Sequence, residues 1–327
     1  MEEKHVLELD NVKIWYPITK GIFKKTVGHV RAVDGVSFSL DKGETLGIVG
    51  ESGCGKTTVG RAMVNLESVT SGSIRMQIND EMRDISSLNK AELLQFRKNV
   101  QMIFQDPYSA LNPMKKIYTA MEEPLVIQGI RSKSERERIM MRALDVVNLP
   151  IVYLFKYPHE FSGGQRQRVC IARALEVDPS ILICDEAVSA LDVSIQAQVL
   201  NLLKKIQQEK KLTYVFIAHD LSVVQYMSDK IAVMYLGNIV ELADAIALTR
   251  EPLHPYTRSL LSAIPIPRVG EKKKRIILQG DVPSPINKPG GCALHERCAN
   301  CMPICREKMP ELRCRPDGHC VACHMYQ

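Results

Sequence analysis

Short apolar runs alternate with amphipathic stretches from residue 7 to about residue 240. Residues 32–40 alternate apolar and polar side chains, which predicts a half-buried β-strand. Residues 181–184 and 214–218 are continuous apolar runs, as is typical of central parallel strands covered on both faces. Helical periodicity is found in residues 56–66, 132–147, 163–177 and 194–208. The alternation of strands and helices predicts an α/β domain.

The pattern changes after about residue 251, where prolines become frequent and long periodic segments end. Seven of the ten cysteines fall between Cys292 and Cys323. We interpret this part as a small, loop-rich, cysteine-rich appendage. In a reducing compartment such a cluster favours bound metal over disulfides.

Composition and charge are those of an ordinary globular protein. The chain of 327 residues is 45% hydrophobic and 24% charged, with a formal net charge of +6. No run approaches the roughly 18–20 apolar residues of a membrane-spanning helix, and the start Met-Glu-Glu-Lys-His does not have the features of a signal peptide. We therefore expect a cytoplasmic protein whose membrane role, if it has one, depends on partner subunits.

A phosphate-binding loop is the clearest chemical motif. The segment that fits G-x-x-x-x-G-K-[ST] consists of Gly50, Glu51, Ser52, Gly53, Cys54, Gly55, Lys56 and Thr57. It follows a predicted strand, residues 45–49, and opens a predicted helix. Glycines let successive N–H groups surround a phosphate, Lys56 can reach the terminal phosphates, and the Thr57 hydroxyl can bind Mg²⁺. This arrangement predicts ATP or a similar nucleotide as the ligand.

Two further motifs supply acidic and backbone groups. The apolar run 181–184 ends in Asp185 and Glu186, which are placed to hold magnesium and to activate a water molecule. Upstream, Ser162 is a predicted helix N-cap. It is followed by Gly163, Gly164 and Gln165, and the glycines allow close approach of the backbone to an anion.

Together these motifs resemble those of the ATP-binding-cassette (ABC) ATPases. Residues 50–57 match the Walker A loop, 181–186 the Walker B strand and Ser162-Gly-Gly-Gln165 the family signature. Four further matches complete the resemblance: Gln105 of the Q-loop, Ser189 and Asp192 of the D-loop, His219 of the H-loop, and Tyr16, which stacks on adenine.

The resemblance implies a P-loop NTPase fold with a RecA-like core, a helical signature subdomain (about residues 106–178) and an antiparallel β edge. By resemblance, Glu186 is the general base, His219 contacts the γ-phosphate and Gln105 couples nucleotide state to the membrane partner. Thr57, Gln105 and Asp185 are the magnesium ligands, and Thr58 joins the ATP-binding set. ATP would lie between Walker A and Walker B of one subunit and the signature motif of its partner.

The C-terminal part resembles one branch of that family. Leu253-His-Pro-Tyr, Gly280-Asp-Val-Pro-Ser-Pro and Gly291-Cys292 are similar to segments of oligopeptide, dipeptide and nickel importer ATPases. The resemblance implies an ABC ATPase domain in residues 1–252 and an importer-type extension in residues 253–327. It also implies a second, different ATPase subunit, two transmembrane permease subunits and an external peptide-binding protein, at the cytoplasmic face of the membrane.

The cysteines allow two metal hypotheses. The family comparison selects Cys292, Cys298, Cys305 and Cys323, which hold a 4Fe–4S cluster in some members. The pairs Cys298-x₂-Cys301 and Cys320-x₂-Cys323 instead have a spacing typical of zinc sites. We expect the iron–sulfur cluster, with zinc as the alternative and no bound metal as a third possibility.

Three other functions remain as alternatives. The same motor could import nickel or another small solute. A soluble ABC-type ATPase acting on nucleic acid or ribosomes is disfavoured, because only about 105 residues separate Lys56 from Ser162, too few for an inserted coiled coil. Intact Glu186 and His219 argue against an iron–sulfur sensor with a vestigial nucleotide site. We expect a peptide importer ATPase that binds no nucleic acid.

Overall fold

The protein is described by a computed structural model that covers residues 5–21, 23–79, 81–264 and 275–327. The chain divides into two compact units, each assembled from separate stretches of sequence. The first unit comprises Met1–Val6, Asp41–Glu44 and Met76–Ile217, and the second comprises Leu7–Leu40, Thr45–Arg75 and Ala218–Gln327. The predicted division of the chain at residue 253 stays a prediction.

Three parallel strands form the core of the first unit. They are β6 (Val100–Ile103), β7 (Ile181–Asp185) and β8 (Thr213–Ala218), in the order β8-β7-β6. Ile183 of β7 pairs with Met102 on one side and Val215 on the other. Every residue of β7 and β8 is buried, which confirms the two apolar strands predicted from the sequence. The short strand β5 (Glu81–Asp84) and the 3₁₀ turn Ile85–Ser87 also belong to this unit.

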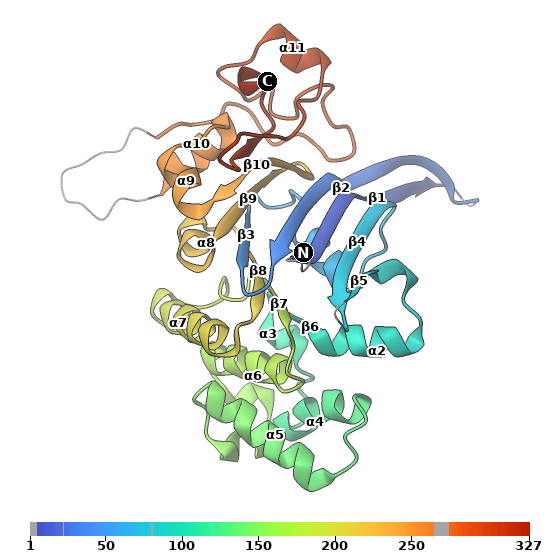
Figure 1. Cartoon of the computed structure of the whole chain (residues 1–327), viewed down its shortest axis with the longest axis vertical. Helices are drawn as coiled ribbons and strands as arrows, with labels where there is room; N and C mark the ends of the chain where they lie inside the picture. Colours follow the sequence, from blue (N-terminus) through green and yellow to red (C-terminus); the bar gives the residue numbers. More distant parts are fainter. Residues whose placement is uncertain (1–4, 22, 80, 265–274) are drawn as a thin grey trace, which may run out of the picture. The chain divides into compact units, whose positions relative to one another are not determined.

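Helices make up most of the remainder of the first unit. They are α2 (Lys90–Asn99), α3 (Pro107–Ala110), α4 (Ile117–Ile127), α5 (Lys133–Val146), α6 (Gly163–Leu175) and α7 (Val193–Lys210), with 3₁₀ turns at Ile151–Phe155 and Pro158–Glu160. In Figure 1, α4, α5 and α6 lie packed together. Side chains cap the starts of the three predicted helices, with Ser132 before α5, Ser162 before α6 and Asp192 before α7.

The second unit contains two groups of strands. In one, β3 (Thr45–Val49) runs parallel to β9 (Lys230–Tyr235), and β10 (Asn238–Asp244) is antiparallel to β9. Two short strands, β12 (Cys320–Val321) and β11 (Arg313–Cys314), extend this group in the order β11-β12-β10-β9-β3. In the other group, β1 (His5–Lys20) lies between β2 (Lys25–Asp41) and β4 (Ser71–Ile78). The strand predicted at residues 32–40 lies within β2.

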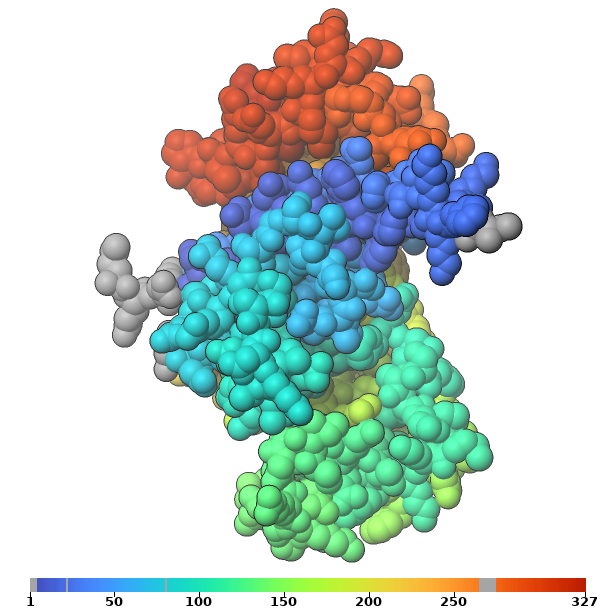
Figure 2. Space-filling model, turned by 90° about the vertical axis from the view of Figure 1, so that its right-hand side faces the viewer, coloured from blue at the N-terminus to red at the C-terminus, as the bar shows by residue number. Residues whose placement is uncertain are grey.

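Short helices complete the second unit. They are α1 (Lys56–Met63), α8 (Leu221–Met227), α9 (Ala245–Arg250), α10 (Pro255–Ala263), α11 (Pro303–Glu307) and a final 3₁₀ turn, His324–Tyr326. Figure 2 shows the surface of the C-terminal residues (orange to red) directly against that of the N-terminal strands (dark blue). Two contacts join these surfaces: the Arg31 N–H donates to the Pro285 carbonyl, and Lys288 forms an ion pair with Asp34. No helix in the described part of the chain is long and apolar enough to cross a bilayer.

Candidate nucleotide-binding site

The predicted phosphate loop connects β3 to α1 in the second unit. Its last glycine, Gly55, has φ of 103°, and a Cβ there would lie 2.2 Å from the Ala32 carbonyl oxygen. Both observations require glycine, because an L side chain would be strained and would collide with backbone. The loop is therefore built for close backbone packing, as a phosphate cradle must be.

Lys56, the first residue of α1, points back over the loop. Its side chain is buried, at 5% exposure, and its Nζ donates to the carbonyls of Gly50 at 2.8 Å and Glu51 at 3.1 Å. These carbonyls satisfy a buried cation. Burial also raises the pKa of the Cys54 thiol beside it, so this loop cysteine is held as a neutral thiol.

Tyr16 and His219 belong to the same unit as the loop. Tyr16 is 38% exposed, and its hydroxyl interacts with Glu67 and with Thr58 of α1. Partial burial, followed by the hydrogen bond to Glu67, raises the pKa of Tyr16. The predicted adenine-stacking residue therefore does lie beside the helix that leaves the phosphate loop. His219 is exposed at the end of β8, directly before the N-cap Asp220 of α8.

Gln105 and Glu186 come together in the first unit. The Gln105 Nε2 donates to the Glu186 carboxylate at 2.7 Å, across 81 residues of sequence. Glu186 follows the buried Asp185 at the carboxyl end of β7 and adopts φ of 45°, while its N–H donates to the Ile217 carbonyl of β8. A left-handed backbone at a residue other than glycine is strained, and such strain concentrates at functional sites.

The two D-loop residues hold the turn that follows Glu186. Ser189 donates its N–H and its hydroxyl to the Glu186 carbonyl. Asp192 caps α7 by accepting from the Ile195 N–H, and a hydrogen bond from the Ser194 hydroxyl is the largest of the effects that lower its pKa. Ser189 therefore holds the turn after Glu186, and Asp192 fixes the start of α7.

The signature residues form a complete capping box at the start of α6. The Ser162 hydroxyl accepts from the Gln165 N–H, and the Gln165 side chain accepts from the Ser162 N–H. Gly164 is buried, and a Cβ there would lie 2.4 Å from Ile195 of α7. The glycines therefore bring the two helix starts together, and Ser162 itself stays exposed.

Sequence reasoning missed two residues that touch the phosphate loop. Tyr256 of α10 accepts a hydrogen bond from the Glu51 N–H at 2.8 Å, and Arg297 forms a 3.0 Å ion pair with the Glu51 carboxylate. The segment Leu253-His-Pro-Tyr256 indicated the branch of the family but no contact with the phosphate loop. No sequence signal pairs Arg297 with a residue 246 positions away.

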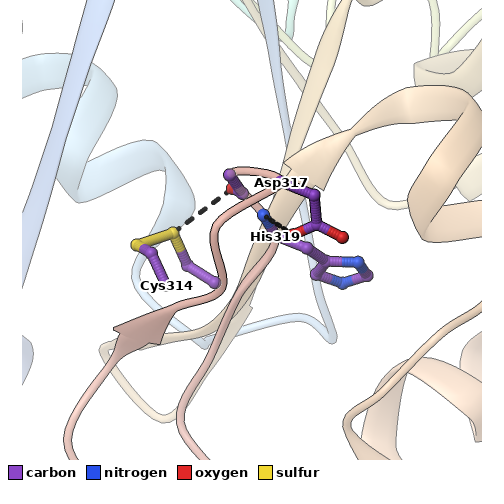
Figure 3. Close-up of a disulfide and its surroundings, with 5 residues drawn as sticks. Cys314, Asp317 and His319 are labelled. Carbon is purple, nitrogen blue, oxygen red and sulfur yellow. Dashed lines mark hydrogen bonds between the residues drawn. A yellow bond between two sulfur atoms is a disulfide. The ribbon is translucent and has the colours of Figure 1, made fainter.

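The metal prediction for the cysteine cluster is wrong. Cys314 and Cys320 form a disulfide, which joins paired positions of β11 and β12 (Figure 3). It removes Cys320 from the predicted zinc set. In the same close-up the Asp317 carboxylate accepts from the His319 N–H, which shapes the turn between the two strands.

The four cysteines predicted to hold iron are free thiols: Cys292, Cys298, Cys305 and Cys323. Burial raises the pKa of Cys292 to about 11. Within the described ranges no group of three or more His, Cys, Asp or Glu side chains could hold a metal ion. The iron–sulfur and zinc expectations are therefore both withdrawn.

Comparison with known proteins identifies the family. Residues 33–189 match the model of the ABC transporter family, and residues 240–305 match that of the oligopeptide/dipeptide transporter C-terminal region. The oligopeptide transport ATP-binding protein AppF of Bacillus subtilis is 51% identical over 99% of this chain and 98% of its own length. The chain belongs to the ABC transporter family. The predicted branch and the predicted ATPase domain are confirmed by these matches.

Other relatives agree with this assignment. The dipeptide transport ATP-binding protein DppF of Haemophilus influenzae is 45% identical over 98% of this chain and 97% of its own length. Among solved structures, an ATP-binding cassette in a dimeric post-hydrolysis state with ADP and Pi superimposes with a TM-score of 0.63 at 28% identity. The superposition covers 73% of this chain and 98% of the solved cassette chain. The ABC cassette fold predicted from the sequence is therefore confirmed.

Proposed function

We propose that this ABC ATPase energises the import of dipeptides or oligopeptides through membrane permease subunits. The observation that carries the proposal is the match of one chain, over nearly its whole length, to ATP-binding proteins named for oligopeptide and dipeptide transport. The separate match of residues 240–305 favours a peptide importer over a soluble ATPase, because that model describes a transporter region.

The residues of the phosphate loop have the chemistry that ATP binding needs. Gly50 to Lys56 supply backbone N–H groups and one buried ammonium group. Thr57, Gln105 and Asp185 offer a hydroxyl, an amide and a carboxylate, the oxygen donors that suit Mg²⁺. Magnesium held by these residues would neutralise charge on the phosphates. We assign Tyr16 to the adenine and Thr58 to the neighbouring phosphate contacts.

Glu186 is proposed as the general base. Gln105 donates a hydrogen bond to its carboxylate, so a movement of one side chain changes the position of the other. His219 is proposed to contact the γ-phosphate. Ser162 to Gln165, with Ser189 and Asp192, are proposed to serve the nucleotide of the partner ATPase subunit.

The assembly is proposed to contain a second, different ATPase subunit and two permease subunits, with an external peptide-binding protein delivering substrate. This chain would then be a peripheral protein of the cytoplasmic membrane face. Co-expression with its permease subunits and affinity purification should recover them together. Recovery of nucleic acid or ribosomes in their place would contradict this assembly.

Replacing Glu186 with Gln tests the catalytic assignment in that complex. The amide cannot accept a proton, so phosphate release should fall by about 10²- to 10⁴-fold while ATP still binds. The matched control is Glu209→Gln, an exposed position on α7. Unchanged phosphate release by Glu186→Gln would show that the general base lies elsewhere, and reconstituted vesicles that take up nickel but no labelled peptide would contradict the substrate class.

A further inference from the structure

The C-terminal extension contacts the phosphate loop at Glu51. The hydroxyl of Tyr256, in α10, accepts from the Glu51 backbone N–H at 2.8 Å. Arg297 donates from Nη1 to the Glu51 carboxylate at 3.0 Å. All three residues belong to the second unit, so these contacts lie within one compact body.

Glu51 uses all of its polar groups to connect the extension with the loop lysine. Its N–H meets Tyr256, its carboxylate meets Arg297, and its carbonyl accepts from the Lys56 Nζ at 3.1 Å. The extension therefore fixes the position of Glu51, and Glu51 in turn fixes where the Lys56 ammonium group rests. Because the ammonium group must meet phosphate, a shift of Glu51 changes the geometry offered to ATP.

The contacts are partly buried, which raises the cost of breaking them. The Arg297 side chain is only 10% exposed, and the same Nη1 also donates to the Tyr235 hydroxyl at 3.3 Å. Tyr256 and Tyr235 are fully buried, with ring centroids 4.8 Å apart. A largely buried guanidinium that loses its carboxylate keeps a poorly solvated charge, so this arrangement favours one position of the loop.

The start of α10, which carries Tyr256, is held in place by further hydrogen bonds that do not involve Arg297. His254 caps α10 by accepting from the Tyr256 N–H, and the N–H groups of Leu253 and His254 both donate to the buried carboxylate of Glu241 in β10. The start of α10 is thus fixed to the strand group that also contains β3, which leads into the loop.

We propose that Tyr256 and Arg297 are positioning residues through which the C-terminal extension sets the geometry of the phosphate loop. The proposal rests on ATP binding at residues 50–57, as proposed above. It implies that ATP affinity and the order of the extension are coupled, and by thermodynamic linkage the coupling acts in both directions.

Nucleotide affinity of the full-length chain tests the proposal. Arg297→Met removes the ion pair, and Tyr256→Phe removes only the hydroxyl and keeps the ring. Each should weaken binding of a fluorescent ATP analogue about fivefold to tenfold, within the usual range for coupled sites. The matched control is Arg313→Met, an exposed arginine of the same extension, which should bind like the wild type.

Two comparisons separate positioning from loss of structure. Arg297→Lys restores a charge within reach of Glu51 and should recover part of the affinity. If Arg297 acts through Glu51, the double variant Glu51→Gln/Arg297→Met should bind no more weakly than the weaker single variant.

Hydrogen exchange supplies a second measurement, and its main result comes from the wild type. Saturating ATP should slow exchange in residues 292–305 of the wild type and slow it less in Glu51→Gln. Wild-type affinity in folded Arg297→Met and Tyr256→Phe, or ATP-independent exchange in the extension, would overturn the inference. Failure of the wild type to bind ATP at all would count against the proposed function instead.

Discussion

Glu186, the proposed general base, combines a strained backbone with a hydrogen-bonded side chain. Its φ of 45° carries strain that a buried strand on one side and a hydrogen-bonded turn on the other maintain. The cost of such a conformation is about 1–3 kcal/mol. The Gln105 amide donates to the carboxylate at 2.7 Å. Both the backbone conformation and this hydrogen bond therefore fix the position of Glu186.

Glu241 is a buried acidic residue that holds the second unit together. Its fully buried carboxylate accepts from the N–H groups of Leu253 and His254 and lies 2.7 Å from the His319 Nε2. Glu241→Leu removes the partner of three buried groups, so the free energy of unfolding should fall by about 3–5 kcal/mol. Urea unfolding measures this free energy. Exposed Glu311→Leu, the control, should stay within about 0.5 kcal/mol of the wild type, and equal unfolding midpoints for the two variants would refute the role.

At the scale of elements, α6 combines a capping box at its start with a buried acid at its end. Glu176, the C-cap residue, is buried, and neither carboxyl oxygen has a hydrogen-bond partner among the described residues. Burial raises the pKa of Glu176 from 4.5 to about 9. The residue is therefore protonated in the folded chain at neutral pH, whereas it is ionised in the unfolded chain.

This difference predicts a pH dependence of stability. The contribution of Glu176 is fully present below about pH 4.5 and is lost as the pH rises toward 9, because the unfolded chain then binds fewer protons. Glu176→Gln removes that loss and should stabilise the chain by about 2 kcal/mol at the alkaline end, the order of one unpaired buried polar group. Unfolding temperatures at about pH 6 and about pH 9 measure the effect, with Glu209→Gln as the exposed control. Parallel pH profiles for wild type and Glu176→Gln would disprove it.

The elements show which features the sequence could predict. The runs at 181–184 and 214–218 became β7 and β8 because an uninterrupted apolar pattern requires burial on both faces. The start of α6 followed from the predicted N-cap Ser162, whereas the caps Ser132 and Asp192 of α5 and α7 were found only in the structure. The predicted end of the first helix at residue 66 was too late, since α1 stops at Met63 and Asn65 turns left-handed with φ of 56°.

Long-range contacts limited the prediction of the site. The family resemblance and the cysteine spacing suggested a metal, because nothing local shows that Cys314 and Cys320 lie opposite each other on two-residue strands. The motif residues of the nucleotide site were identifiable because their order along the chain is informative. The contact of Arg297 with Glu51 depends on the folded path of the extension, which no periodicity encodes.

At the scale of the whole molecule, the exposed first residue of the signature, Ser162, matters most. Ser162 lies at the start of α6, where its side chain is exposed. The related cassette with bound ADP and Pi is dimeric. If the signature serves the nucleotide of a partner subunit, its loss should spare ATP binding by this chain and damage turnover by the complex.

Ser162→Arg tests this division of labour against Ser132→Arg, which removes the equivalent cap from α5. Each substitution costs about 1 kcal/mol of helix capping, so the two variants should be equally stable. Both isolated chains should bind ATP like the wild type. In the assembled complex only Ser162→Arg should reduce phosphate release, by about 10²-fold, since an anion-stabilising group is lost from the transition state. Equal turnover by the two complexes, or loss of ATP binding by the isolated Ser162→Arg chain alone, would mean that the signature does not act on the partner's nucleotide.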